Sequence, residues 1–194
     1  MIKKLFTYFA QFPSREGILT MAVNGTSPMP EYDEVLADIE LQTDERRIDG
    51  LDNYAYGQSF EELQARIDKC VGSFLYADYG EFQVQTDGRK SLEYVERMAV
   101  TVAMKLGNNV DAIERMIASD RTLAMLAEIH AWLMADVENG LIDWADRDSL
   151  DMVEIVPFVA SELRSIGWTL MFNATSPDVL GTHERFRSFV RENY

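Results

Sequence analysis

Two regions of the sequence place an apolar residue at every second position, which is the period of a β-strand. These regions cover residues 98–106 and 166–172. Each follows a second strand-like segment, residues 73–85 in the first case and residues 152–160 in the second, after a short polar connection. The pattern predicts two antiparallel β-hairpins. Pro157 has no N–H to donate to a sheet, so its strand is expected at a sheet edge or at a bulge.

Helical spacing of apolar residues predicts shorter helices before and after these strands. Residues 2–12 carry an aromatic stripe that Pro13 ends, and we interpret this stripe as part of a core rather than as a membrane anchor. Ser59 and Glu62 form a capping box that predicts a helix to about residue 70. A last helix is predicted over residues 182–193.

A long helix is predicted over residues 111–139, because apolar residues recur there at helical spacing until Asn139 and Gly140. Ser119 is expected to act as an N-cap inside it. We expect the apolar side of the last strand, which begins with Trp168, to pack on this helix. The expected inner stripe of the helix is Ile113, Met116, Ile117, Leu123, Leu126, Ile129, His130, Leu133, Met134 and Val137.

Three other segments have weaker patterns. Residues 17–25 predict a strand that ends in a turn at Asn24 and Gly25. Residues 34–43 fit both helical and alternating spacing, and we favour a strand in their second half. Residues 44–58 are predicted to be a polar connection.

The order hairpin, long helix, hairpin predicts an α+β fold: an antiparallel sheet of two hairpins, with a long central helix and other helices packed on one face. Residues 74–194 are expected to form this α+β core. Residues 1–73 are expected to be an N-terminal extension of helix, strand and loop, and the 194 residues together to form one compact domain.

The chain is strongly acidic, with 33 Asp and Glu against 18 Lys and Arg and a net charge of −15. A nucleic-acid reader normally has a basic surface, so specific nucleic-acid readout is not expected. The negative charge fits a basic partner, or a wall past which DNA slides without sticking.

Nothing in the sequence indicates export or membrane insertion. The N-terminal residues lack the cleavage site of a signal peptide, and no run of 18 apolar residues occurs. The single cysteine, Cys70, cannot form an internal disulfide and is interpreted as a small buried apolar residue. The protein is therefore expected to act in the cytoplasm of the cell that makes it.

Enzyme motifs are also lacking: no phosphate-binding glycine loop, nucleophile elbow or zinc-ligand spacing is present. His130 is interpreted as a core or interface residue, and His183 as a solvated or capping residue. The densest acidic cluster runs through residues 143–151, but its spacing differs from a calcium-binding loop. We expect no catalysis, no cofactor and no metal. A carboxylate-dependent metalloenzyme at residues 143–151 is kept as a third hypothesis.

Aromatic residues beside glycines supply candidates for a protein–protein interface, where tyrosine is enriched. A subunit that exposes a sheet edge could pair head to tail with copies of itself and so build a ring. The candidate interface residues are Tyr54, Tyr56, Tyr76, Tyr79, Pro157 and Trp168.

Three segments, RMAVTVAMKL (97–106), AWLMADVENG (131–140) and VEIVPFVASELRSIGWTLMFNATSPD (153–178), resemble small virion proteins of tailed bacteriophages. This group comprises the tail-terminator, tail-completion and neck-ring proteins. The resemblance covers residues 74–175 and implies an α+β fold, a homo-oligomeric ring at the neck or tail, contacts with neighbouring virion proteins, and no catalysis. It places the protein in a virion assembled in the host cytoplasm. Residues 1–73 depart from the compact members of the group.

The alternative hypothesis is an acidic cytoplasmic adaptor or inhibitor. Such a protein would use its negative surface to occupy a basic site on a host protein, for example a nuclease or a DNA-binding protein.

Overall fold

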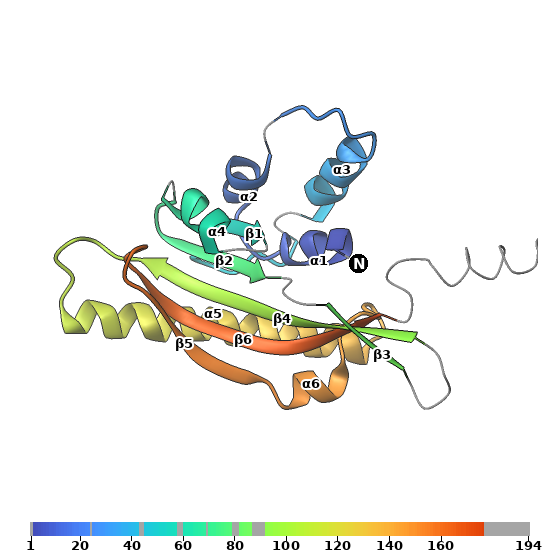
Figure 1. Cartoon of the computed structure of the whole chain (residues 1–194). Helices are drawn as coiled ribbons and strands as arrows, with labels where there is room; N and C mark the ends of the chain where they lie inside the picture. The colour runs from blue at the N-terminus through green and yellow to red at the C-terminus, as the bar shows by residue number, and fades with distance from the viewer. Residues whose placement is uncertain are drawn as a thin grey trace, which may run out of the picture.

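The computed structural model describes residues 2–23, 25–42, 45–57, 60–68, 70–78, 82–86 and 92–176. They form an α+β fold in which helices pack against one mixed β-sheet (Figure 1). The elements in chain order are α1 (Ile2–Phe9), α2 (Arg15–Ala22), α3 (Tyr32–Gln42), β1 (Asn53–Gly57), α4 (Phe60–Ile67), β2 (Ser73–Asp78), β3 (Phe82–Thr86), β4 (Leu92–Lys105), α5 (Ala112–Glu138), α6 (Arg147–Asp151), β5 (Glu154–Ala160) and β6 (Ser165–Ser176).

The sheet has the strand order β1-β2-β4-β6-β5, and β3 pairs with the first part of β4. The antiparallel pairing of both predicted hairpins is confirmed, since β2 and β3 pair with β4 and β5 pairs with β6. The single strand predicted over residues 73–85 is two strands, β2 and β3. β4 also pairs with β6 along most of its length, so these two strands form the centre of the sheet.

The prediction of a purely antiparallel sheet is wrong, because β1 runs parallel to β2. β1 lies within residues 44–58, which we expected to be a polar connection. Parallel neighbours need a crossover rather than a tight turn, and the connection from β1 to β2 contains α4. Residues 1–73 therefore contribute a strand to the same sheet as residues 74–176.

Helices lie on both faces of the sheet, not on one as predicted. Leu75 and Val102 share a buried cluster with Leu126 of α5 and with side chains of α1. Phe74, which points to the opposite face because it is adjacent to Leu75, lies in a second cluster with Ile67 of α4.

The long helix is confirmed, and Figure 1 shows it running beside β4 and β6. Asp111 caps it: its side chain accepts a hydrogen bond from the backbone N–H of Glu114 at 2.8 Å, and the Glu114 carboxylate accepts one from Asp111 N–H at 3.1 Å. The expectation of an internal cap at Ser119 is wrong, because α5 is continuous through that residue.

The N-terminal segment is more helical than predicted. The core role of α1 is confirmed, since Leu5 and Phe9 are fully buried. The strands predicted at residues 17–25 and in residues 34–43 are the helices α2 and α3. Ser14 starts α2 by accepting a hydrogen bond from Gly17 N–H at 3.1 Å, and Asp33 in the first turn of α3 favours a helix N-terminus.

α2 packs against the edge of the sheet at β1. A Cβ added at Gly17 would lie only 1.8 Å from the carbonyl oxygen of Asp52 and 2.8 Å from Cα of Asn53, so glycine permits this close approach. The two margins of the sheet therefore differ: α2 covers the β1 margin, and β5 forms the other.

Candidate functional site

The β5 margin is the first candidate surface. Within the described residues β5 pairs only with β6, and its register is continuous from Glu154 to Ala160, so Pro157 lies at a sheet edge rather than at a bulge. Pro157 is exposed, as are the side chains of Ile155 and Val159. Three apolar residues on one side of an edge strand are thus available to a partner.

A second exposed apolar region lies at the start of α5. Ile113, Met116 and Ile117 are 63%, 64% and 42% exposed. We expected them to face the core, and this prediction is wrong. The buried residues of α5, such as Ala118 and Leu126, lie on one side of the helix, and the three exposed residues lie on the other side. A helical projection of the sequence shows two apolar sides, which is the signal we missed.

These two regions lie at the same end of the molecule. Arg115 and Val159 line the same small cavity, of about 190 Å³, between the start of α5 and the β5–β6 turn. We call Ile113, Met116, Ile117 and Val159, with Arg115 and Arg121 beside them, the end surface.

The charged side chains at and beside the end surface differ in whether other residues of the protein bind them. Arg164, at the β5–β6 turn, donates to the side chain of Asn108, and Lys105 donates to the carbonyl oxygens of Ile67 and Asp68 at 2.9 and 3.1 Å. Asp111 and Glu114 are held in the helix cap. The side chains of Arg115 and Arg121 are exposed and make no hydrogen bond or ion pair with the described residues.

The predicted interface tyrosines lie mostly inside the molecule. Tyr54 is fully buried and its hydroxyl donates to the Phe6 carbonyl oxygen at 3.0 Å. Tyr56 is half-buried and donates to the Ile2 carbonyl oxygen at 3.1 Å. Tyr54 and Tyr56 lie beside Phe6, with ring centroids 5.2 and 5.0 Å from it. They attach α1 to the sheet, so Tyr54 offers no surface to a partner in this conformation.

The candidate Tyr76 adds no surface. Tyr76 is 7% exposed, on the sheet face that carries α4. Tyr79 lies outside the described residues. Burial raises the pKa of Tyr54 well above that of an exposed tyrosine, so the phenol stays neutral.

Trp168 joins the sheet to the long helix. It is half-buried opposite Pro157 in the β5–β6 register, and its indole N–H lies 3.0 Å from the carbonyl oxygen and 3.1 Å from Oγ of Ser119. The predicted packing of the last strand on the long helix is confirmed, because Leu170 and Phe172 share a buried cluster with Leu126.

Those predicted reactive groups that the structure describes do not converge on a catalytic arrangement. His130 Nε2 lies 2.9 Å from the Leu150 carbonyl oxygen, so it donates there and holds α6 to α5. His183 lies outside the described residues. Asp143 pairs with Lys4 at 3.4 Å, and Asp151 lies 3.8 Å from Arg147. No group of three or more His, Cys, Asp or Glu within the described ranges is placed to hold a metal ion.

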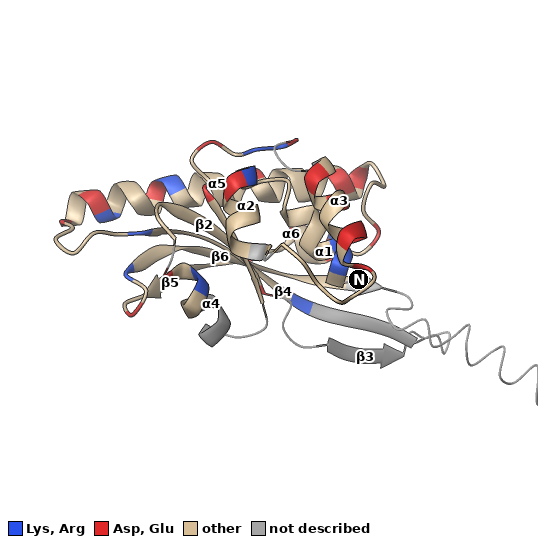
Figure 2. Ribbon diagram, turned by 90° about the horizontal axis from the view of Figure 1, so that it is seen from above, with Lys and Arg blue, Asp and Glu red and all other residues tan. Residues whose placement is uncertain are grey.

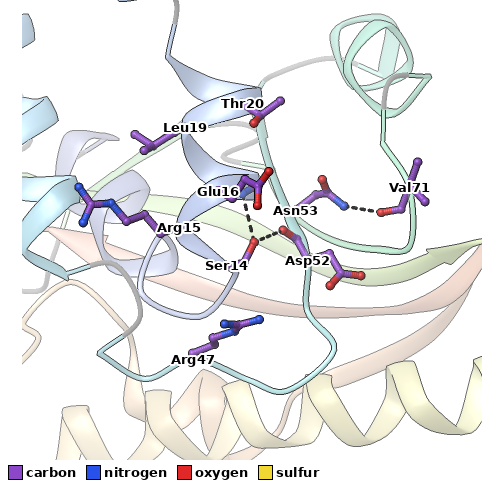
Figure 3. Close-up of a pocket in the computed structure, with 10 residues that line it drawn as sticks. Ser14, Arg15, Glu16, Leu19, Thr20, Arg47, Asp52, Asn53 and Val71 are labelled. Carbon is purple, nitrogen blue, oxygen red and sulfur yellow. Dashed lines mark hydrogen bonds between the residues drawn. The ribbon is translucent and has the colours of Figure 1, made fainter.

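A cavity of about 820 Å³ lies at the N-terminal end of α2 (Figure 3). Two of its polar side chains, those of Ser14 and Asn53, are bonded to the backbone of the fold. The Ser14 hydroxyl donates to the Asp52 carbonyl oxygen at 2.6 Å, and the Asn53 amide donates to the carbonyl oxygens of Val71 and Ser73, both at 2.8 Å. Neither histidine nor cysteine lines it, and the Ser14 hydroxyl bonds to a backbone carbonyl rather than to a side-chain base.

A buried ionic cluster, which sequence reasoning missed, ties the N-terminal segment to α5. Asp136 is buried, accepts a hydrogen bond from the Tyr8 hydroxyl at 2.8 Å and pairs with Arg46. Arg46 also lies over the Trp132 ring, 4.4 Å from its centroid. Burial, and then the hydrogen bond to Asp136, raise the pKa of Tyr8, while the hydrogen bond to Asp136 raises the pKa of Arg46.

Among the described helices, none combines the length and the apolar character needed to cross a membrane. Comparison with known protein families, with curated proteins and with solved structures finds no match to this chain. The resemblance to phage virion proteins therefore stays a prediction.

Proposed function

We propose that this protein is a structural subunit that assembles with copies of itself and has no catalytic role. Following the resemblance of residues 74–175, the assembly we propose is a ring at the neck or tail of a tailed phage, formed in the host cytoplasm and in contact with neighbouring virion proteins.

The end surface is the observation that carries this proposal. Four large apolar side chains from α5 and β5 are exposed at one end of the molecule, and the Ile155 side chain on β5 extends them. Single exposed apolar residues are normal on a soluble protein, but a gathered set marks an interaction surface. The net charge of −15 fits a ring wall that does not retain DNA passing through it.

The covered β1 margin restricts how copies can join. Because α2 packs against the chain entering β1, the β5 strand of one copy cannot pair with the β1 strand of the next in this conformation. A neighbour must instead dock on the side chains of the end surface, or pair β5 with its own β5 about a two-fold axis.

Light scattering of the purified chain tests the proposal. We expect a mass above the 22.2 kDa of one chain. The double variant Ile113→Lys and Ile117→Lys should fall to the monomer mass, since it places charge in the apolar contact. Met152→Lys is the control, because Met152 is an exposed apolar residue away from the end surface. A wild-type chain that remains monomeric as its concentration is raised, alone and with candidate virion proteins, would overturn the proposal.

The acidic adaptor is the second candidate, and α3 is the observation that favours it. Residues 31–42 contain five carboxylates and no lysine or arginine. The adaptor hypothesis predicts a monomer that forms a salt-sensitive complex with a basic DNA-binding protein, so the same scattering experiment separates the two functions.

A further inference from the structure

The end surface combines exposed apolar side chains with cations that the described chain leaves unused. Arg115 and Arg121 make no ion pair within it, whereas the nearby carboxylates of Asp111 and Glu114 are engaged in the helix cap. Asp120 is the remaining carboxylate of the first turns of α5. The end surface therefore has arginine side chains free to meet acidic groups on a partner.

The outer side of α3 has the complementary character. Ile39 is its fully packed residue, and the opposite side of the helix presents Leu41, which is 80% exposed. Glu34 and Asp38 lie on that side, are exposed, and make no ion pair with the described residues, and Asp38 also lines a cavity with Lys3 and Lys4. An apolar centre bordered by carboxylates is thus available to a partner that offers apolar and cationic groups.

These two surfaces lie at opposite ends of the molecule. Figures 1 and 2 both place α3 at the end away from the start of α5, and Figure 2 shows the acidic residues that line α3. One chain therefore carries both halves of a complementary pair, but it cannot bring them together within itself. This geometry fits a contact between identical chains in which each copy uses a different surface toward each neighbour.

We infer that the end surface of one copy docks on the outer side of α3 of the next copy. Ile113, Met116 and Ile117 cover Leu41, while Arg115 and Arg121 face Glu34 and Asp38. The inference rests on the proposed function and adds the identity and polarity of the interface. Such a head-to-tail contact closes into a ring if the rotation between copies closes, and otherwise continues as a filament.

Paired charge reversals test this contact. The end variant carries Arg115→Glu and Arg121→Glu, and the α3 variant carries Glu34→Arg and Asp38→Arg. Each alone should weaken assembly by about a hundredfold, because like charges then face each other across the contact. The control, Arg47→Glu with Arg97→Glu, makes the same change of charge as the end variant at exposed sites outside both surfaces and should assemble as the wild type does.

Mixing the two variants gives the sharpest readout. The end variant retains an intact α3 and the α3 variant retains an intact end surface. The remaining contact, a reversed end surface on a reversed α3, also pairs opposite charges, so the mixture should assemble to the wild-type mass from alternating copies. A chain that carries all four reversals should assemble to the wild-type mass, because attraction is restored with opposite polarity. Thermal melts followed by circular dichroism establish that each variant is folded.

The outcomes separate this inference from the proposed function. A wild-type chain that is monomeric at every concentration removes the proposed function and the inference with it. If the wild type assembles and the end and α3 variants keep its mass and affinity, the inference alone is overturned. It is also overturned if the mixture and the fourfold variant both stay monomeric. Loss in each variant, with recovery of assembly both in the mixture and in the fourfold variant, supports it.

Discussion

Replacing Arg46 by methionine tests the structural role of the buried ionic cluster. Methionine keeps much of the length and apolar stem of arginine but removes the guanidinium. The Asp136 carboxylate then retains the Tyr8 hydroxyl as a hydrogen-bond donor and loses its cationic partner.

The expected cost follows from the exposure of the two side chains. The Asp136 side chain is 4% exposed and that of Arg46 is 21% exposed, so the variant leaves a carboxylate with little access to water. Removing one partner of a buried pair costs about 3–5 kcal/mol, and the lost contact with Trp132 adds about 0.5–1 kcal/mol. Because Arg46 itself is partly solvated, we expect the free energy of unfolding to fall by about 3–4 kcal/mol in total.

Urea denaturation measures this change, and Lys4→Met is the matched control. Lys4 pairs with Asp143 at 3.4 Å, but both side chains are mostly exposed, so its replacement should cost less than about 1 kcal/mol. Combining Arg46→Met with Asp136→Leu should recover part of the loss, because no buried charge then remains. If Arg46→Met and Lys4→Met cost the same within about 0.5 kcal/mol, the reasoning from burial is wrong.

Other substitutions test the sheet and its contacts. Gly167→Ala should lower the free energy of unfolding by about 3 kcal/mol or prevent folding, because the new Cβ would lie 2.0 Å from the Val102 carbonyl oxygen. Gly107→Ala, whose nearest neighbour would be 3.8 Å away, should change it by less than about 1 kcal/mol in the same urea titration. Trp168→Ala should cost about 3 kcal/mol in that assay, since the half-buried ring packs on α5 and its N–H is bonded. Burial raises the pKa of the Cys70 thiol from 9.0 to about 11, so this residue contributes stability that is present below pH 9.0 and is lost as the pH rises toward 11. In pH-dependent unfolding, Cys70→Ala should therefore show a shallower decline over that range; an identical decline would contradict the role of Cys70.

The elements with long, regular patterns were predictable from the sequence. β4 and β6 alternate over many residues, and the 27 residues of α5 repeat apolar positions at helical spacing. In such elements the period itself distinguishes strand from helix. Pro157 also predicted correctly that its strand, β5, lies at the edge of the sheet, because proline has no N–H to donate to a second neighbouring strand.

The short elements depended on contacts that the sequence does not display. The segment that forms α2 is eight residues long, and its helix begins where Ser14 bonds to Gly17 N–H while Gly17 packs on the chain entering β1. β1 has only five residues, too few for a clear pattern. It is a strand because it pairs in parallel with β2, to which it is connected through α4. Local preferences are weak priors that such tertiary contacts override.

The sequence predicted that the candidate site lies at a sheet edge, but it did not predict which other residues belong to the site. Tyr54 was predicted at an interface because of its aromatic character. It is buried instead, because its hydroxyl finds a hydrogen-bond acceptor inside the fold, the Phe6 carbonyl oxygen. Ile113 and Met116 were assigned to the core because they are apolar, although their helical phase differs from that of Leu126. Exposure of an apolar residue at the end of a helix depends on where the sheet stops beneath it, which only the assembled fold reveals.

Electron micrographs of the purified wild-type chain test self-assembly most directly. The account predicts closed rings of uniform diameter, or short stacks of them, built from copies that all point the same way around the ring. A field of separate particles of single-chain size at the highest soluble concentration, unchanged by added neck or tail proteins, would contradict it.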